Sequence, residues 1–290
     1  GTMETETAVW DVRNGHRIQT FASGGVKKLA LSDSGKILAT CDKTNNGINL
    51  WDVATGATLR AIEEPGGEVT GMQFVDGDAA LAVNMNSTMA LRSCADGSEI
   101  WKRENIYGAT TFSPDRTCMA FVVENENDYG VEVFRIGEAA PVAASALTNK
   151  KDCPDLVFLL AISPDNTRLY AAFPKLTGEK DYDARVISLD MASGTIVAEH
   201  IIPRFVPSAI ATNPSGDTVA VGLSNGRGVL LSATKLDNPR ELVGHKIQLL
   251  SFAFSPDSTR LVTASGDRTF KLWDTEEGRE ILTIQDASRM

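Results

Sequence analysis

Three residues near the C-terminal end have the types that form a hydrolase triad: His245, Ser265 and Asp267. A serine hydroxyl activated by a histidine, which an acidic side chain orients, is a nucleophile for acyl transfer. The residues around Ser265, however, lack the G-x-S-x-G pattern of a nucleophile elbow. We therefore expect no catalytic residues, and we look for a structural role for these side chains in the elements that hold them.

Other candidate sites lack the spacing that their chemistry requires. The sequence Asp181-Tyr182-Asp183 has no spaced oxygen ligands or glycine of a calcium loop. The glycine-rich segment 222–228 lies between two expected strands, so it predicts a hairpin and not a phosphate-binding loop. The cysteines form no C-x-x-C pair, and we expect reduced thiols within strands, at Cys41, Cys94, Cys118 and Cys153. We expect no cofactor and no metal.

Composition narrows the class of protein. The 290 residues carry 28 Lys and Arg against 38 Asp and Glu, a formal net charge of −10. A negative field disfavours a nucleic-acid backbone, so we expect no nucleic-acid partner. No stretch is long and apolar enough for a membrane span, and the polar N-terminus is unlike a secretory signal. We expect an intracellular, cytoplasmic protein.

One turn motif recurs along the chain. It begins at residues 32, 75, 113, 163, 213 and 255, at intervals of 38 to 50 residues. Its clearest copies read Ser-Pro-Asp, and an apolar run follows each copy. Short alternating segments with Pro, Asp, Ser and Gly turns between them predict four strands per repeat. Because one such sheet cannot bury its own faces, the repeats must stack as the blades of a propeller.

The repeats resemble the WD40 β-propeller family. Trp-Asp dipeptides close the third strand at Trp10-Asp11, Trp51-Asp52 and Trp273-Asp274, and segment 244–274 resembles a complete repeat. The resemblance implies a buried structural network of His245, Ser265 or Thr263, Asp267 and Trp273. The other repeats carry different residues where Trp would stand, so apolar packing must hold them: Arg92, Phe134, Leu189 and Leu231.

The strand count predicts six complete blades and an N-terminal half-blade, nominally a seven-bladed propeller. Residues 1–7 are expected to be a cloning scar and a polar lead, and residues 8–290 a single propeller domain that stops within a repeat. The ring is then open, completed by further chain, or closed by association. Exposed sheet edges favour such pairing, so self-association through the incomplete blade is expected.

Four segments account for the longest departures from the repeat: 124–130, 148–155, 173–183 and 203–207. We expect them as long loops on the face that carries the second-to-third and fourth-to-first strand connections, the top face. Loops on a rigid scaffold often carry binding function, although simple loop decoration is the competing interpretation. The predicted partner-binding residues are Tyr129, Lys151, Lys180, Tyr182, Arg204 and Phe205.

These observations favour a non-enzymatic scaffold that docks protein or peptide partners on the top face. The alternative is a sensor or regulatory module of a larger protein, such as an NTPase or a kinase. A third hypothesis, an enzyme with its site at the propeller axis, requires converging His, acidic or metal-binding residues on the inner strands. With only three histidines, the sequence shows no such set.

Overall fold

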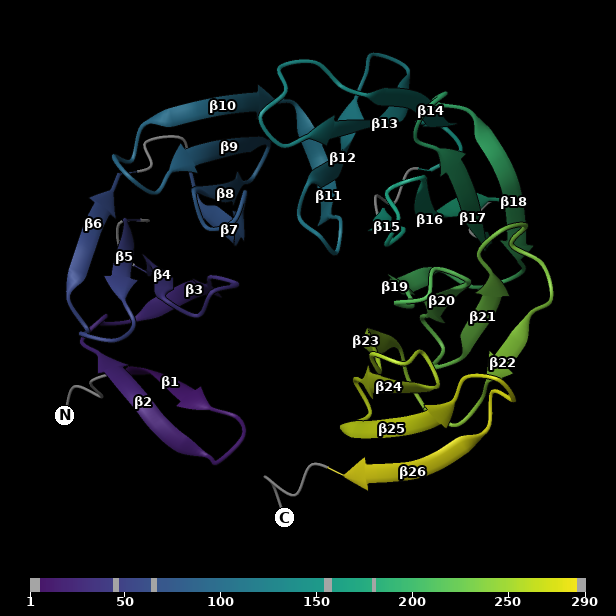
Figure 1. Ribbon diagram of the computed structural model, residues 1–290. Helices are drawn as coiled ribbons and strands as arrows, with labels where there is room; N and C mark the ends of the chain where they lie inside the picture. Colours follow the sequence, from purple (N-terminus) through teal and green to yellow (C-terminus); the bar gives the residue numbers. More distant parts are fainter. Residues whose placement is uncertain (1–5, 44–46, 64–66, 154–157, 179–180, 286–290) are drawn as a thin grey trace. The chain divides into compact units, whose positions relative to one another are not determined.

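The computed structural model describes residues 6–43, 47–63, 67–153, 158–178 and 181–285. These residues form 26 β-strands and no helix (Figure 1). The chain divides into two compact units, residues 1–107 and 108–290. The expectation of one domain over residues 8–290 stays a prediction.

The first unit contains a two-stranded sheet, here called the half-blade, and two four-stranded blades. The strands of the half-blade are β1 (Thr7–Asp11) and β2 (His16–Phe21). The next blade contains β3 (Val26–Leu31), β4 (Ile37–Asp42), β5 (Ile48–Asp52) and β6 (Thr58–Ile62). The last blade of this unit contains β7 (Val69–Val75), β8 (Ala80–Met85), β9 (Thr88–Ser93) and β10 (Glu99–Glu104).

The second unit contains four more blades. The first two have the strands β11 (Ile106–Phe112), β12 (Cys118–Glu124), β13 (Asp128–Arg135), β14 (Ala143–Asn149), β15 (Leu159–Ile162), β16 (Arg168–Leu176), β17 (Tyr182–Asp190) and β18 (Ile196–Ile202). The last two have β19 (Pro207–Thr212), β20 (Thr218–Leu223), β21 (Gly228–Ser232), β22 (Arg240–Leu242), β23 (Leu249–Phe254), β24 (Arg260–Ser265), β25 (Thr269–Asp274) and β26 (Glu280–Gln285).

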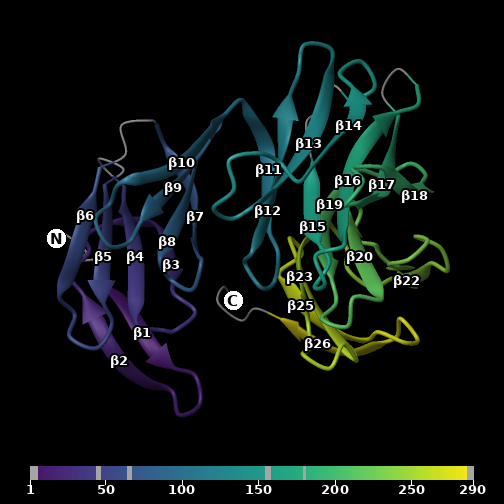
Figure 2. The same ribbon diagram turned by 45° about the horizontal axis from the view of Figure 1, so that its top comes forward.

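Every sheet follows chain order, as Figures 1 and 2 both show. Neighbouring strands are antiparallel, so each blade is a simple meander. The second strand of a blade is the most deeply buried: all six residues of β20 and the first six of β12 are buried. Such near-continuous apolar strands are expected where both faces of a sheet are covered. Six complete blades and one half-blade confirm the predicted all-β propeller repeats.

The Ser-Pro-Asp motif forms the turn between the first and second strands. The Ser113 hydroxyl donates to Asp115 Oδ1 at 2.6 Å and accepts the Cys118 N–H at 2.9 Å. The same Asp115 oxygen accepts the N–H of Thr117 at 3.1 Å. Segments 163–168 and 255–260 repeat these three bonds. Short polar side chains that bond to nearby backbone explain why this motif marks every clear turn.

These turns are also joined from one blade to the next. Asn166 Nδ2 donates to Asp115 Oδ2 at 2.7 Å, and the Ser215 N–H donates to Ser258 Oγ at 3.0 Å. In the first unit, the Asp33 N–H donates to Asp78 Oδ1 at 3.0 Å. Each of these bonds connects the turn of one blade with the turn of its sequence neighbour.

Two of the predicted long loops are largely strand. Segment 173–183 extends β16 and β17 to nine residues each, with only residues 177–181 left to connect them. Pro174 lies beyond residues 169–172, the part of β16 that pairs with β15, and this position suits a residue without an N–H. Segment 124–130 is a tight hairpin closed by the Asn125 N–H and the Asp128 carbonyl at 3.0 Å. The expectation of long loops there was wrong.

The four cysteines are free thiols. Cys41 and Cys118 lie within β4 and β12, as predicted. Cys94 follows β9, and Cys153 lies between β14 and β15, so their predicted placement in strands was wrong.

Candidate binding site

Hydrogen bonds donated by backbone N–H groups link the four predicted segments in series. The Lys150 N–H donates to the Asn127 carbonyl at 3.2 Å, and the Leu176 N–H donates to the Asp152 carbonyl at 2.8 Å. The Arg204 N–H then donates to Asp183 Oδ1 at 2.8 Å. These bonds place segments that are far apart in sequence at one end of the blades β11–β14, β15–β18 and β19–β22.

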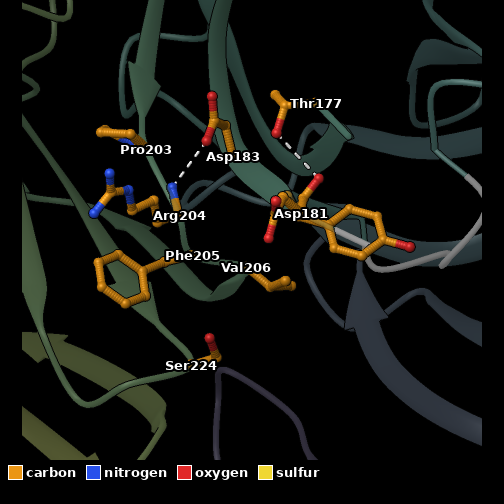
Figure 3. Close-up of a pocket in the computed structure, with 9 residues that line it drawn as sticks. Thr177, Asp181, Asp183, Pro203, Arg204, Phe205, Val206 and Ser224 are labelled. Atoms are coloured by element: carbon orange, nitrogen blue, oxygen red, sulfur yellow. Dashed lines mark hydrogen bonds between the residues drawn. The ribbon is translucent and has the colours of Figure 1, made fainter. Parts of the chain in front are cut away.

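Three of the predicted residues lie around one hollow of about 610 Å³: Tyr182, Arg204 and Phe205. Its other lining residues are Thr177, Asp181, Asp183, Pro203, Val206 and Ser224 (Figure 3). The hollow lies between the β16–β17 connection, the β18–β19 connection and the β20–β21 turn. All of it belongs to the second unit.

Local hydrogen bonds shape two sides of this hollow. The Thr177 N–H and hydroxyl both donate to the Asp181 carbonyl, at 2.9 and 3.1 Å, which closes the β16–β17 connection. Arg204 has a φ of +69°, and its N–H is held by Asp183 Oδ1. That left-handed residue reverses the chain between β18 and β19.

Two contacts hold the Phe205 side chain in place. Its ring packs against the buried cluster of the blades β15–β18 and β19–β22. The Arg227 guanidinium lies over the ring, 5.6 Å from its centroid, and forms an ion pair with Glu241. A cation over an aromatic face is a favourable contact, so Phe205 is positioned by both packing and charge.

The remaining three predicted contact residues do not line the hollow. Tyr129 is only 5% exposed, and its ring centroid is 5.2 Å from that of Phe158. Phe158 in turn packs on Phe173, at 5.5 Å. Tyr129 is therefore part of the hydrophobic interior. Its prediction as a partner-contacting residue was wrong. Lys151 is exposed but does not line the hollow. Lys180 lies outside the described residues.

The predicted structural network in the last blade is present, and Thr263 rather than Ser265 forms its link to His245. Trp273 Nε1 donates to Thr263 Oγ1 at 2.8 Å, and Thr263 Oγ1 lies 2.7 Å from His245 Nε2. His245 Nδ1 lies 3.2 Å from the Asp267 carboxylate. Neutral His245 protonated on Nδ1 satisfies the whole chain: Trp273 donates to Thr263, Thr263 to His245, and His245 to Asp267.

Burial and hydrogen bonding set the charges in this network. Burial lowers the pKa of His245 below its usual value and outweighs the opposing effect of Asp267. Burial alone would raise the pKa of Asp267, but hydrogen bonds from Thr269 and from the Lys246 N–H hold it well below its usual range. The network therefore combines a neutral imidazole with an ionised carboxylate.

Ser265 is the residue that differs from the predicted network. Its hydroxyl donates to the Ile247 carbonyl at 2.9 Å and accepts the Asp267 N–H at 3.1 Å. It shapes the β24–β25 turn, while Thr263 makes the link to His245. Since Ser265 is not bonded to His245, the three residues do not have the nucleophile–base contact of a hydrolase triad.

A shorter version of the network occurs in the blade β3–β6. Trp51 Nε1 donates to Thr40 Oγ1 at 2.8 Å. In the blade β3–β6, Leu38 pairs with Trp51 across the strands, and Thr40 follows two residues later. In the last blade, Leu261 pairs with Trp273, and Thr263 follows two residues later. This spacing was available in the sequence and identifies the Trp–Thr pair in both blades.

Comparison with known proteins agrees with the strand pattern. The family model described as "WD domain, G-beta repeat" matches residues 9–52 and 237–274. These matches contain most of the half-blade, most of the blade β3–β6 and most of the last blade. The chain contains WD40 repeats in these two regions. Its intermediate blades keep the meander without the Trp-Asp dipeptide.

Several known proteins resemble parts of the chain. An uncharacterized WD repeat-containing protein from Synechocystis is 25% identical over 179 residues, 61% of this chain and 49% of that protein. Actin-interacting protein 1 from Drosophila melanogaster is 38% identical over 28% of this chain and 13% of its own length. The serine-threonine kinase receptor-associated protein of Dictyostelium discoideum is 34% identical over 26% of each chain. The chain thus spans about half the length of the first of these relatives and less of the others.

The described residues give two further observations. They contain no helix long and apolar enough to cross a membrane. They also contain no group of three or more His, Cys, Asp or Glu side chains arranged to hold a metal ion.

Proposed function

We propose that this WD40-repeat protein is a non-enzymatic scaffold that docks protein or peptide partners at the hollow around Arg204 and Phe205. The hollow is the observation that carries this proposal. The β16–β17, β18–β19 and β20–β21 connections meet there, and sheets support all three. Exposed Arg204 and half-buried Phe205 are the residue types that anchor protein interfaces. WD40 domains generally bind protein partners, which supports the same function.

A paired substitution tests this site. Affinity capture with mass spectrometry identifies a partner, and its affinity for purified variants is then measured by calorimetry. We expect Arg204→Gln with Phe205→Leu to weaken binding by at least tenfold, because an interface anchor contributes about 2 kcal/mol or more. Leucine retains apolar packing on the core, so folding is expected to persist.

Arg268→Gln is the matched control. Arg268 is exposed and has a φ of +67°, close to that of Arg204, but it lies in the β24–β25 turn. We expect the control to bind within about twofold of the unchanged protein. Equal affinity for the paired variant and the control would move the binding site away from the hollow.

We also propose self-association through the half-blade. Among the described residues, β1 pairs only with β2, whereas its counterpart in each complete blade pairs on both sides. Trp10, on β1, is 56% exposed. An edge strand with an exposed aromatic side chain favours pairing with another chain.

Sedimentation velocity tests this association. The proposal predicts a concentration-dependent dimer that Trp10→Glu converts to monomer, because the substitution places a charge at the edge. A monomer at all concentrations for the unchanged protein would contradict it.

We propose an intracellular, cytoplasmic location. The four free thiols support it, since reducing compartments preserve unpaired cysteines.

A further inference from the structure

We propose that the hollow receives a basic side chain, arginine or lysine, from the docked partner. This inference rests on the proposed function and specifies the chemistry of the partner. It follows from two carboxylates with oxygens that accept no hydrogen bond from the described residues, an apolar lining beside them and the surrounding balance of charge.

Asp181 and Asp183 provide the carboxylates. They stand two residues apart where β17 begins, a spacing that directs side chains to one face of an extended chain. Asp183 Oδ1 accepts the Arg204 N–H, which leaves Oδ2 available. Within the described part of the chain, no group donates a hydrogen bond to that oxygen or to the Asp181 carboxylate. Two neighbouring acceptors of this kind suit a guanidinium or an ammonium group.

The apolar lining suits the rest of such a side chain. Pro203, Phe205 and Val206 line the same hollow as the two carboxylates (Figure 3). Lysine and arginine place their aliphatic stems along apolar surface while the charged end reaches polar groups. The contact of Arg227 with one side of the Phe205 ring shows that this environment already accommodates a guanidinium.

Among the described residues, no cation is paired with either of the two carboxylates. Figure 3 shows the Arg204 side chain extending away from Asp181 and Asp183. Arg227 is paired with Glu241. Lys175 is the cross-strand neighbour of Asp183, but no described ion pair joins them. Together with the net charge of −10, this arrangement attracts a basic partner and repels an acidic one.

Three blocked tripeptides test the inference directly. The probes are acetyl-Gly-Arg-Gly-amide and its lysine and glutamate counterparts, titrated into ¹⁵N-labelled protein and followed by amide chemical shifts. We expect the basic probes to produce saturable shifts at residues 181–183 and 203–206, and the glutamate probe to produce none there. Equal shifts with the glutamate probe, or shifts of the basic probes confined to other residues, would overturn the inference.

Isosteric variants supply the second arm. Asp181→Asn with Asp183→Asn removes both charges but keeps an oxygen that accepts the Arg204 N–H. We expect at least a tenfold loss of affinity for the basic probes. Glu138→Gln with Asp237→Asn removes the same charge from exposed residues outside the hollow, and we expect less than a twofold change. Equal affinity in the two paired variants would contradict the inference.

The two proposals fail differently. If a captured partner loses affinity with Arg204→Gln and Phe205→Leu but not with Asp181→Asn and Asp183→Asn, the docking site stands and the basic ligand is wrong. If neither pair affects the partner, the docking site itself is wrong.

Discussion

Replacing Trp273 with alanine should lower the free energy of unfolding by about 3–5 kcal/mol, the usual cost of emptying a large buried site. Trp273 is 1% exposed and is the largest of the fully buried side chains described. Its ring packs with Ala220, Leu230, Leu242 and Leu261, which joins the last blade to the one before it. Urea denaturation followed by circular dichroism measures the loss.

Two further variants separate packing from hydrogen bonding. Trp273→Phe retains most of the apolar volume but leaves Thr263 without its indole donor, so we expect a smaller loss, on the order of 1–3 kcal/mol. Trp10→Ala changes the same residue type at an exposed position and, at concentrations where the protein is monomeric, should change the free energy of unfolding little. A loss below about 1 kcal/mol for Trp273→Ala would refute the proposed importance of this contact.

Replacing Gly226 with alanine should cost about 3 kcal/mol of stability. A Cβ there would stand 2.7 Å from the His245 carbonyl oxygen and 2.8 Å from that of Ile247. Backbone atoms cannot move aside as a flexible side chain does, and overpacking of this kind costs about 1–3 kcal/mol. The φ of +90° adds the penalty that residues with a Cβ pay for a left-handed conformation, about 1–2 kcal/mol.

Gly137 provides the matched control for Gly226. Its φ is +89°, but no atom lies within 4 Å of the position that a Cβ would take. Gly137→Ala therefore measures the conformational penalty alone, and the difference between the two variants measures the collision. Thermal denaturation measures the melting temperatures of both variants. Equal decreases would show that the predicted collision at Gly226 does not destabilise the protein.

The blades could be predicted from sequence because their signals are local. The Ser-Pro-Asp turns and Trp-Asp dipeptides report on residues a few positions away, so strand number and the half-blade followed from them. The choice between Thr263 and Ser265 was harder. Residues two apart on a strand share a face, so both satisfy the pattern. Only the three-dimensional position of His245 selects Thr263.

The candidate site depended on contacts that no local pattern reports. Tyr129 looked like an exposed anchor because its burial comes from Phe158, on a distant segment. Segment 173–183 looked like a loop because its polar residues conceal the continuation of two strands. Asp181 and Asp183 were considered only as calcium ligands. Their place beside Phe205 depends on how the chain turns at Arg204.

The hydrogen bonds between the turns of successive blades bear on how such a chain can change its length in evolution. Each bond joins a blade to its sequence neighbour, as Asn166 joins Asp115. Duplication of the whole repeat that holds Asn166 also copies Asp165, the counterpart of Asp115, so the new junction keeps a donor and an acceptor. Gain or loss of a partial repeat would separate these groups. At such a junction, the whole repeat is the segment whose addition keeps the donor and the acceptor together.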